Sequence, residues 1–376
     1  MSASDARQFK RYKVVAKTAE SACITSFVLQ PEDGSALPTW QPGQYLIFKF
    51  DLEGQSYLRH YSIAAAPGNP AGLRIAVKRE AAPAEFPDAP AGVISQHMHD
   101  TVHVGDTLVA AGPLGDFVLN QNSERPVLLI SGGVGVTPVL AMLQQLVQHS
   151  DRRVDFIHGC QDGNLHAFAS EVQALVAQRA NVHSHLCYLT PTDTDRQHAA
   201  FKVEGLLTRE HLQSWLPLDD YECYVCGPTP FMQAVWQMLR SLGIAQDRIH
   251  YEFFGTATVL EKEPVGSEVA VADEASVSVT PTTAQAVDAS GETVEFVGKT
   301  SALAWDPAQP SLLDFAEAQG LEPYFNCRSG LCNSCMCTLV SGEVEYVEEP
   351  LDMPPEGKVL LCCSKPRGAV VIELAE

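Results

Sequence analysis

The chain has 376 residues, of which 45% are hydrophobic, and this is enough for two or three domains with cores of their own. Its 11 cysteines are too few for a disulfide scaffold, and neither a signal peptide nor an apolar run of about 18 residues is present, so we expect a cytoplasmic protein without a membrane span. The formal net charge of -21 argues against nucleic acid as a partner, because phosphate would be repelled.

Residues 7–118 contain short segments in which apolar and polar residues alternate, broken by glycine and proline. The clearest are residues 45–50, 73–78 and 107–111. A period of two is typical of strands with one buried face. This part of the chain is therefore predicted to form an antiparallel β-barrel.

Residues 124–255 have a different pattern, in which short apolar runs alternate with helical segments. Strands that alternate with helices predict a parallel sheet. The apolar face of the last helix is assigned to the core and not to a cofactor. The predicted elements are strands at 127–130, 154–158 and 221–225 and helices at 138–149 and 231–242.

Residues 256–290 lack a helical period and are predicted to be an acidic linker. Residues 291–376 then show a strand pair at 292–305, a short helix at 311–319 and a cysteine-rich loop. This last part carries 14 Asp and Glu residues against 5 Lys and Arg residues. Such a surface suits a basic patch on a partner protein, and solubility alone is an equally good explanation.

Four cysteines near the C-terminus have the spacing of a plant-type 2Fe-2S site. Cys327, Cys332 and Cys335 are separated by four and then two residues, and a distant cysteine follows. Small residues in this loop let backbone N–H groups turn toward the sulfurs. Zinc is the alternative, but zinc sites usually pair two short knuckles. For the fourth ligand, Cys362 and Cys363 are both geometrically possible.

The predicted barrel carries Arg59-His60-Tyr61-Ser62 on a strand. A buried arginine can hold a phosphate through two hydrogen bonds, an aromatic ring can cover a flavin, and a serine hydroxyl can reach the flavin N5 atom. Further along, Gly92-Val93-Ile94-Ser95 opens a short helix whose free N–H groups suit a pyrophosphate. Two phosphate-binding devices in one barrel favour FAD over FMN.

A glycine-rich turn follows the strand predicted at 127–130 and reads Gly132-Gly133-Val134-Gly135-Val136-Thr137-Pro138. Glycines let the backbone approach a pyrophosphate, Thr137 is predicted to cap the helix, and Pro138 suits its first turn. A second strand ends in Cys226-Gly227-Pro228. The carboxyl ends of strands are where such sheets bind ligands.

These residues carry a resemblance to the ferredoxin-NADP reductase superfamily, and within it to the reductase half of flavohaemoglobins. The resemblance implies three parts: an FAD-binding antiparallel β-barrel at 7–118, an α/β parallel-sheet NAD-binding domain at 124–255, and a β-grasp 2Fe-2S ferredoxin domain at 291–376. The motifs that carry it are Pro42-Gly-Gln-Tyr45, Arg59-His-Tyr-Ser62, Gly133-Val-Gly-Val-Thr-Pro138, His166-Ala-Phe, Cys226-Gly-Pro228 and Ile249-His-Tyr-Glu-Phe-Phe-Gly255.

The same resemblance assigns roles to individual positions. Catalytic positions are Tyr61, Ser62, Cys226 and Glu252. The fourth cluster ligand is Cys362, because the residues before it resemble the family pattern at that position. Cofactor-binding positions are Tyr45, Arg59, His60, Tyr61, Ser62, Val77, Lys78, Gly92, Val93, Ser95, Gly133, Val134, Gly135, Val136, Thr137, Pro138, Cys226, Gly227, Pro228 and Phe254.

The implied activity is electron transfer from NADH to FAD, then to the 2Fe-2S cluster and on to a separate protein. The order of the domains is similar to reductases of Rieske-type oxygenases and of the hybrid-cluster protein. Only a few residues precede the barrel, so a globin, and with it nitric oxide dioxygenase activity, is not expected. The alternative from another class is a redox-sensing regulator without steady turnover.

Three residues keep two interpretations each. Asp162 follows the strand at 154–158 and could accept a ribose hydroxyl, which would favour NADH over NADPH, or it is an ordinary loop carboxylate. Cys337 and Cys363 are interpreted as small core residues, with ligand exchange as the alternative.

Overall fold

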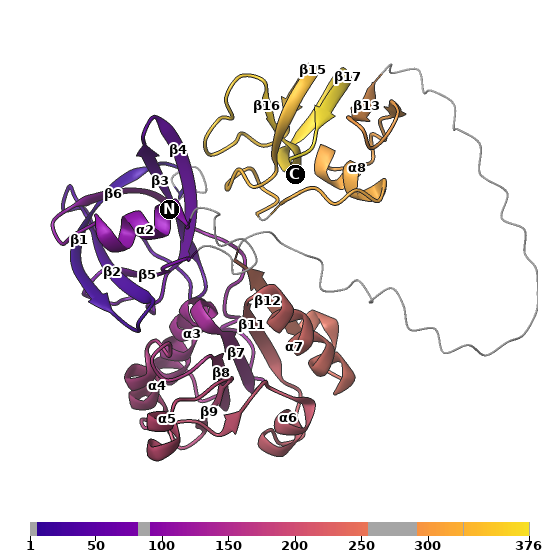
Figure 1. Ribbon diagram of the computed structural model, residues 1–376. Helices are drawn as coiled ribbons and strands as arrows, with labels where there is room; N and C mark the ends of the chain where they lie inside the picture. The colour runs from indigo at the N-terminus through magenta and orange to yellow at the C-terminus, as the bar shows by residue number, and fades with distance from the viewer. Residues whose placement is uncertain (1–5, 82–90, 255–291, 326, 376) are drawn as a thin grey trace, which may run out of the picture. The chain divides into compact units, whose positions relative to one another are not determined.

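The computed structural model describes residues 6–81, 91–254, 292–325 and 327–375, and the chain divides into two compact units between residues 255 and 256 (Figure 1). The linker predicted at 256–290 lies outside the described residues. Within the described ranges, no helix combines the length and the apolar character needed to cross a membrane.

The N-terminal sheet has six strands, and every neighbouring pair in it is antiparallel. The strand order is β4-β3-β6-β1-β2-β5, and a bridge between Ile63 and Ile75 links the end of β4 to β5, which curls the sheet toward a barrel. The segments predicted from alternation fall on β3, β5 and β6. The elements are β1 (Lys10–Ala19), β2 (Ile24–Pro31), β3 (Tyr45–Leu52), β4 (Gln55–Ser62), β5 (Leu73–Lys78), α2 (Val93–Asp100) and β6 (Thr107–Leu114).

The barrel is filled by apolar side chains such as Phe27, Leu46 and Phe48, which are fully buried. Helix α2 is fixed to it by a charged side chain: Lys17 Nζ donates to the carbonyls of His99 and Val102, each at 2.7 Å. A cation that binds the last carbonyls of a helix also offsets the negative end of the helix dipole. The helix predicted to receive a pyrophosphate is therefore held firmly at its far end.

The second sheet also has six strands, in the order β10-β9-β8-β7-β11-β12, and all of them are parallel. Helices pack on both of its faces (Figure 1). The chain leaves β7 toward β8 on one side, and β11 lies on the other, so the order reverses between β7 and β11. The elements are β7 (Val127–Gly132), α3 (Val136–His149), β8 (Val154–Cys160), α4 (Ala169–Val176), β9 (Val182–Tyr188), α5 (Asp193–His198), β10 (Val203–Glu204), α6 (Arg209–Trp215), β11 (Glu222–Gly227), α7 (Thr229–Ser241) and β12 (Ile249–Phe253).

The C-terminal unit contains a mixed five-stranded sheet in the order β14-β13-β17-β15-β16. Only β13 and β17 pair in parallel among its described strands. The predicted strand pair is the antiparallel pair β13 and β14, and the predicted helix is α8, which Ser311 caps by accepting from the Asp314 N–H. The elements are β13 (Thr293–Phe296), β14 (Leu303–Ala304), α8 (Leu312–Ala318), β15 (Met336–Tyr346), β16 (Lys358–Leu360) and β17 (Ser364–Glu373).

Candidate functional site

Two glycines shape the turn between β7 and α3 for different physical reasons. Gly133 has a φ of +53°, and a Cβ built there would have nothing within 4 Å, so its backbone is open to a ligand. A Cβ on Gly135 would lie 2.2 Å from the Cys226 carbonyl oxygen, so the turn packs directly on the end of β11. The glycine-rich turn thus follows β7 and packs on the end of β11. The strand order reverses between these two strands, and this is the usual ligand position in such a sheet.

The start of α3 differs from the prediction. The helix begins at Val136, its N-cap is Gly135, and no side chain caps it. The Thr137 hydroxyl instead donates to the Val134 carbonyl at 3.1 Å. The prediction that Thr137 caps the helix was wrong because a 3-10 turn, Gly133–Gly135, precedes α3 and moves its start before that residue.

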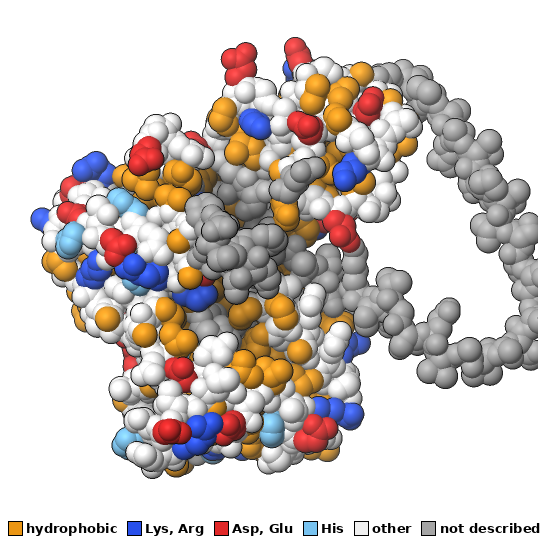
Figure 2. All heavy atoms as spheres, in the orientation of Figure 1, with side chains coloured by type: hydrophobic (Ala, Val, Ile, Leu, Met, Phe, Trp, Pro, Cys, Tyr) orange, Lys and Arg blue, Asp and Glu red, His pale blue; other side chains and the backbone are white. Residues whose placement is uncertain are grey.

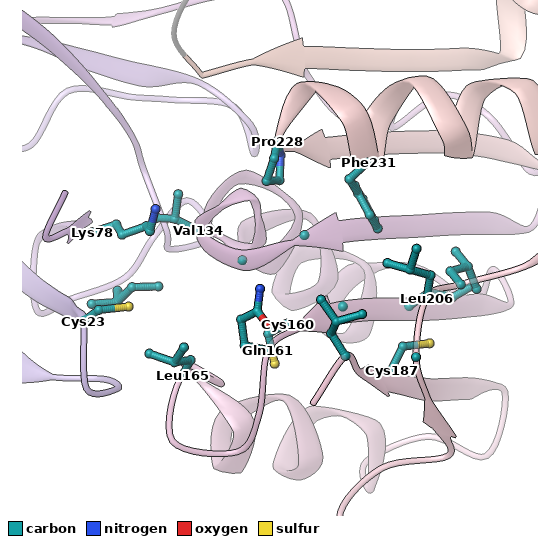
Figure 3. Close-up of a pocket in the computed structure, with 18 residues that line it drawn as sticks. Cys23, Lys78, Val134, Cys160, Gln161, Leu165, Cys187, Leu206, Pro228 and Phe231 are labelled. Atoms are coloured by element: carbon teal, nitrogen blue, oxygen red, sulfur yellow. The ribbon is translucent and has the colours of Figure 1, made fainter. Parts of the chain in front are cut away.

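A cavity of about 300 Å³ lies at the carboxyl edge of the second sheet (Figure 3). Four of the predicted positions line it: Lys78, Gly133, Val134 and Pro228. Asp162 is not among the lining residues, and its Oδ1 accepts from the backbone N–H groups of Asn164 and Leu165. Gly132, the first residue of the glycine-rich turn, also lines the cavity. Lining residues that the sequence analysis did not select are Cys23, Ile24, Ile157, Gly159, Cys160, Gln161, Leu165, Cys187, Leu189, Gly205, Leu206, Leu207 and Phe231.

Phe231, in the first turn of α7, lies on a platform of three glycines. Cβ atoms built on Gly132, Gly159 and Gly227 would each have a Phe231 ring carbon as a neighbour, at 3.0, 3.6 and 2.9 Å. These glycines end β7, follow His158 in β8 and end β11, so the ring spans three strands. Gly132 and Gly227 belong to the two motifs found in the sequence. The lack of a side chain at these positions was the only sequence signal that an aromatic ring could pack there.

Ser62, Cys226 and Glu252 form a buried polar group at the ends of β4, β11 and β12. Cys226 and Glu252 are partners in the pairing of β11 with β12. Burial raises the pKa of Glu252 to about 8, with the nearby Ser62 hydroxyl lowering it in part. Burial and then the Glu252 carboxylate raise the pKa of the Cys226 thiol.

Two atoms of this group have no hydrogen-bond partner in the protein: Ser62 Oγ and Glu252 Oε2 are buried and unsatisfied. An unsatisfied buried polar atom costs on the order of 1–3 kcal/mol, so it calls for a functional explanation. His60 Nε2, on the same strand as Ser62, is likewise buried without a partner. These atoms fit a site in which a flavin and a nicotinamide supply the missing polar groups.

The remaining flavin positions are arranged along β3 and β4. The His60 ring stacks on Tyr45 with centroids 4.8 Å apart, and burial lowers the pKa of His60 to about 4. Burial also raises the pKa of Tyr61. Arg59 is exposed and lies over the Tyr57 ring at 5.7 Å, and its assignment to a flavin phosphate stays a prediction.

The other predicted flavin positions make contacts of their own. Gly92 is the N-cap of α2, and no side chain caps that helix. Ser95 Oγ donates to the Gly92 carbonyl at 2.9 Å and accepts from the Glu80 N–H. Lys78 pairs with Glu80 at 2.9 Å. Val93 and Phe254 are exposed, and Val77 is buried.

In the C-terminal unit, each of the four predicted cluster cysteines receives one backbone N–H hydrogen bond. The donors are Leu331 to Cys327, Ser334 to Cys332, Cys362 to Cys335 and Gly330 to Cys362, at 3.2, 3.4, 3.4 and 3.3 Å. Such donors stabilise thiolates, and iron–sulfur sites use them to tune the cluster. The cysteine loop therefore fits a cluster held by four thiolates.

The choice between Cys362 and Cys363 has a geometric basis. Cys362 Sγ accepts from the Gly330 N–H at 3.3 Å, and the Cys362 N–H donates to Cys335 Sγ at 3.4 Å, so Cys362 lies against the cysteine loop. Cys363 Sγ instead lies 3.9 Å from the Leu360 carbonyl oxygen.

Among the described residues, no three His, Cys, Asp or Glu side chains could hold a single metal ion. A 2Fe-2S cluster shares its four thiolates between two irons.

Arg328, which the sequence analysis did not select, anchors the cysteine loop. Its guanidinium lies 4.0 Å from the Phe325 ring centroid and pairs with Asp314 of α8 at 3.2 Å and with Glu317 at 2.5 Å. Arg328 has a φ of +53°, so these contacts hold a backbone conformation that is unfavourable for a side chain of this size.

Three family models match the chain: the oxidoreductase FAD-binding domain at residues 11–119, the oxidoreductase NAD-binding domain at 129–237 and the 2Fe-2S iron-sulfur cluster binding domain at 294–367. A flavohemoprotein of Bacillus thuringiensis subsp. konkukian is 43% identical over 258 residues, which are 68% of this chain and 63% of that protein. The chain thus spans less than two thirds of the length of the curated flavohemoproteins that it matches first.

Two solved structures are similar. The flavohem-like FAD/NAD-binding domain of nitric oxide dioxygenase from Vibrio cholerae O1 biovar El Tor is 36% identical, with a TM-score of 0.57 over 65% of this chain and 98% of that one. Phthalate dioxygenase reductase is 23% identical with a TM-score of 0.54, over 97% of this chain and 98% of that one, which shows a shared fold.

The fold and the domain matches define an oxidoreductase that binds FAD, a nicotinamide nucleotide and a 2Fe-2S cluster. The chain belongs to the ferredoxin-NADP reductase superfamily, in a form that also carries a 2Fe-2S ferredoxin domain. The predicted fold class and cofactors are confirmed, and the chain is an electron-transfer module of this superfamily. The roles of individual residues stay predictions.

Proposed function

We propose that the protein is an NADH-dependent reductase that passes electrons through FAD and the 2Fe-2S cluster to a separate protein. One observation carries the proposal. A single chain holds both the buried, unsatisfied atoms of Ser62 and Glu252 and four cysteines that each accept a backbone N–H. The first suits a two-electron donor, and the second suits a one-electron carrier.

A bound FAD supplies the exchange between a two-electron donor and a one-electron acceptor. The residues of the chain bind and orient. Ser62 Oγ and Glu252 Oε2 are free to hydrogen-bond, and Glu252, with a pKa of about 8, holds its proton at neutral pH. The buried Cys226 thiol is neutral as well. A neutral polar set orients a nicotinamide without trapping either its reduced or its oxidised form by charge.

The acceptor is proposed by analogy. Phthalate dioxygenase reductase has this domain composition and, by its name, serves a dioxygenase. A Rieske-type oxygenase or a hybrid-cluster protein would suit this chain as the partner. NADH is the proposed coenzyme. The cavity-lining residues that come after β8 in the sequence include no basic side chain that could hold the 2′-phosphate of NADPH. Comparing the specificity constants for NADH and NADPH tests this, and a clear preference for NADPH would contradict it.

The reductase proposal is tested by separating its two halves. The resemblance implies that ferricyanide takes electrons directly from reduced flavin, whereas cytochrome c draws them through the cluster. In Cys332→Ser the cluster loses a soft ligand, so cytochrome c reduction should fall by about tenfold or more while NADH-ferricyanide activity persists. Cys337→Ser is the matched control, because Cys337 is a buried thiol in the same unit and should leave both activities unchanged.

If both activities of Cys332→Ser fall together while FAD is retained, the serial path from flavin to cluster is wrong. If the wild-type protein binds both cofactors but shows no steady oxidation of NADH with either acceptor, a redox-sensing regulator becomes the better description. The same substitution at Cys362 and at Cys363 distinguishes the fourth ligand.

A further inference from the structure

Cys363 is a buried thiol directly beside the proposed fourth ligand, and the reductase proposal does not use it. It is 1% exposed and ends the 3-10 turn Leu361–Cys363 between β16 and β17. Successive residues of such a turn point about 120° apart, so the two neighbouring side chains diverge. Cys362 Sγ accepts from the Gly330 N–H of the cysteine loop, and Cys363 Sγ contacts the Leu360 carbonyl oxygen.

The Cys363 side chain lies against Gly330, the residue whose N–H donates to Cys362 Sγ. A Cβ built on Gly330 would be 2.9 Å from Cys363 Sγ and 3.4 Å from Cys363 Cβ. Gly330 has a φ of +69°, which a side chain rarely adopts. The peptide that donates at 3.3 Å to Cys362 therefore rests on the Cys363 side chain.

The segment before β16 fixes both partners of this contact. The Leu351 N–H donates to the Gly330 carbonyl, and the Val347 N–H donates to the Cys363 carbonyl, each at 2.9 Å. Because the two backbones are held by the same segment, a change in the volume of the Cys363 side chain cannot be relieved by moving one of them alone. The change is passed to the Gly330 N–H.

The Gly330 N–H is the point at which this contact bears on the cluster. The Cys363 thiol itself makes a weak contact with the Leu360 carbonyl oxygen at 3.9 Å. Hydrogen bonds to a ligand sulfur stabilise the more negative, reduced state of an iron–sulfur cluster and so raise its reduction potential. The Gly330 donor to Cys362 Sγ thus depends on the Cys363 side chain.

We propose that Cys363 is a positioning residue that sets the reduction potential of the cluster by supporting the Gly330 N–H that donates to Cys362 Sγ. The proposal rests on the ligand set Cys327, Cys332, Cys335 and Cys362. In this proposal Cys363 does not bind iron, and its role goes beyond packing in the core. Its effect is on the driving force for electron flow out of the flavin.

The test is a redox titration of the full-length holoprotein, followed by the visible and EPR signals of the cluster. Cys363→Ala removes the support, so the ratio of reduced to oxidised cluster at a fixed poise should fall about tenfold, or about 59 mV for one electron. Cys363→Ser keeps a side chain that can still contact Gly330 and should lie between this variant and wild type. Cys337→Ala is the control, since it truncates another buried cysteine, 3% exposed, and should leave the potential unchanged.

Iron and sulfide content per chain accompany each titration. A wild-type potential in Cys363→Ala with a full cluster would overturn the proposal, as would equal shifts in Cys363→Ala and Cys337→Ala. Loss of the cluster in both Cys363→Ala and Cys363→Ser would also overturn it, because a positioning residue is dispensable for assembly. A wild-type protein that binds the cluster but does not reduce cytochrome c would contradict the reductase proposal and leave this measurement intact.

Discussion

At the scale of single residues, the carboxyl group of Glu252 connects burial with chemistry. Its pKa of about 8 results from burial, which disfavours the carboxylate. In an unfolded chain the same group loses its proton near its ordinary pKa of 4.5. The stability that the protonated carboxyl contributes is therefore complete below pH 4.5 and is lost as the pH rises toward 8.

Glu252→Gln should remove this dependence. Relative to wild type, the variant should gain on the order of 2–4 kcal/mol of unfolding free energy between about pH 5 and about pH 9. Denaturant unfolding followed by flavin fluorescence reports the unit that contains Glu252. The exposed Glu124→Gln is the control, and an equal gain in that variant, or none in Glu252→Gln, would contradict the assignment.

The pH profile of NADH-ferricyanide activity gives an independent reading of the same group. Wild-type activity should decline above about pH 8, because the ionised carboxyl no longer donates a hydrogen bond and adds charge beside the nicotinamide. Glu252→Gln should keep activity at pH 7 and show no decline in that range. A profile that is identical in both proteins would remove Glu252 from the catalytic set.

Another residue-scale prediction concerns two stacked histidines, His158 and His166, close to the start of the glycine-rich turn. His158 accepts or donates at 2.9 Å to Ser131, its ring lies 4.9 Å from that of His166, and His166 hydrogen-bonds Tyr188 at 2.7 Å. Burial lowers the pKa of His166 to about 4. In the unfolded chain His166 therefore binds a proton below about pH 6.5, whereas in the folded protein it stays neutral down to about pH 4.

Stability should consequently fall as the pH drops from 6.5 toward 4, by up to about 3 kcal/mol for His166. His166→Gln should be less stable at pH 7 but should have a flatter dependence on pH over this range. Denaturant unfolding at several pH values measures the slope. The exposed His149→Gln should keep the wild-type slope, and a wild-type slope in His166→Gln would show that the acid lability lies elsewhere.

At the scale of elements, periodicity and turn chemistry predicted most of the frame. Strands β3, β5, β6, β7, β8 and β11 and helices α3, α7 and α8 lie where alternation, buried runs and apolar stripes put them, because each has a regular buried face. The start of α3 was missed because a 3-10 turn uses the same residues as an α-helical cap. The exposure of Arg59 depends on its surroundings in the folded chain, which a four-residue motif does not contain.

The candidate site was only partly readable from the sequence for a related reason. Motifs record residues near a ligand in sequence, such as Gly133 and Pro228, but not side chains that reach the cavity from other elements, such as Cys23 and Leu206. The assignment of Cys362 over Cys363 stays a prediction, and it depends on the direction of each side chain in a 3-10 turn. The distances in sequence from Cys335 to Cys362 and to Cys363 differ by only one residue, so spacing does not distinguish the two.

Phe231 provides the element-scale prediction, because its ring spans the ends of three strands under the nucleotide cavity. Phe231→Ala should open the floor of the cavity and raise KM for NADH by about tenfold or more, while kcat changes little. Phe231→Leu, which keeps most of the apolar volume, should restore most of the affinity. Steady-state kinetics and calorimetry with ADP-ribose measure both, and a fall in kcat with unchanged KM would assign Phe231 to the chemistry and not to binding.

At the scale of the whole molecule, the sign of the charge is the feature that bears on partners. The chain carries a net charge of -21, and the residues after the predicted linker have 14 acidic against 5 basic side chains. Figure 2 shows acidic side chains dispersed among apolar and a few basic ones on the visible face of the C-terminal unit. Dispersed charge acts through its long-range field more than through individual ion pairs.

If this field guides a basic acceptor, cytochrome c reduction should slow as salt screens it. Raising the ionic strength from about 10 mM to about 300 mM shortens the Debye length from about 30 Å to less than 10 Å, so the second-order rate constant should fall by about tenfold. Ferricyanide is an anion that the same field repels, and its rate should rise or stay constant. Parallel stopped-flow measurements with both acceptors separate screening from a general effect of salt on the enzyme. Rates that fall together, or a cytochrome c rate that ignores salt, would mean that the acidic surface serves solubility and that docking depends on other contacts.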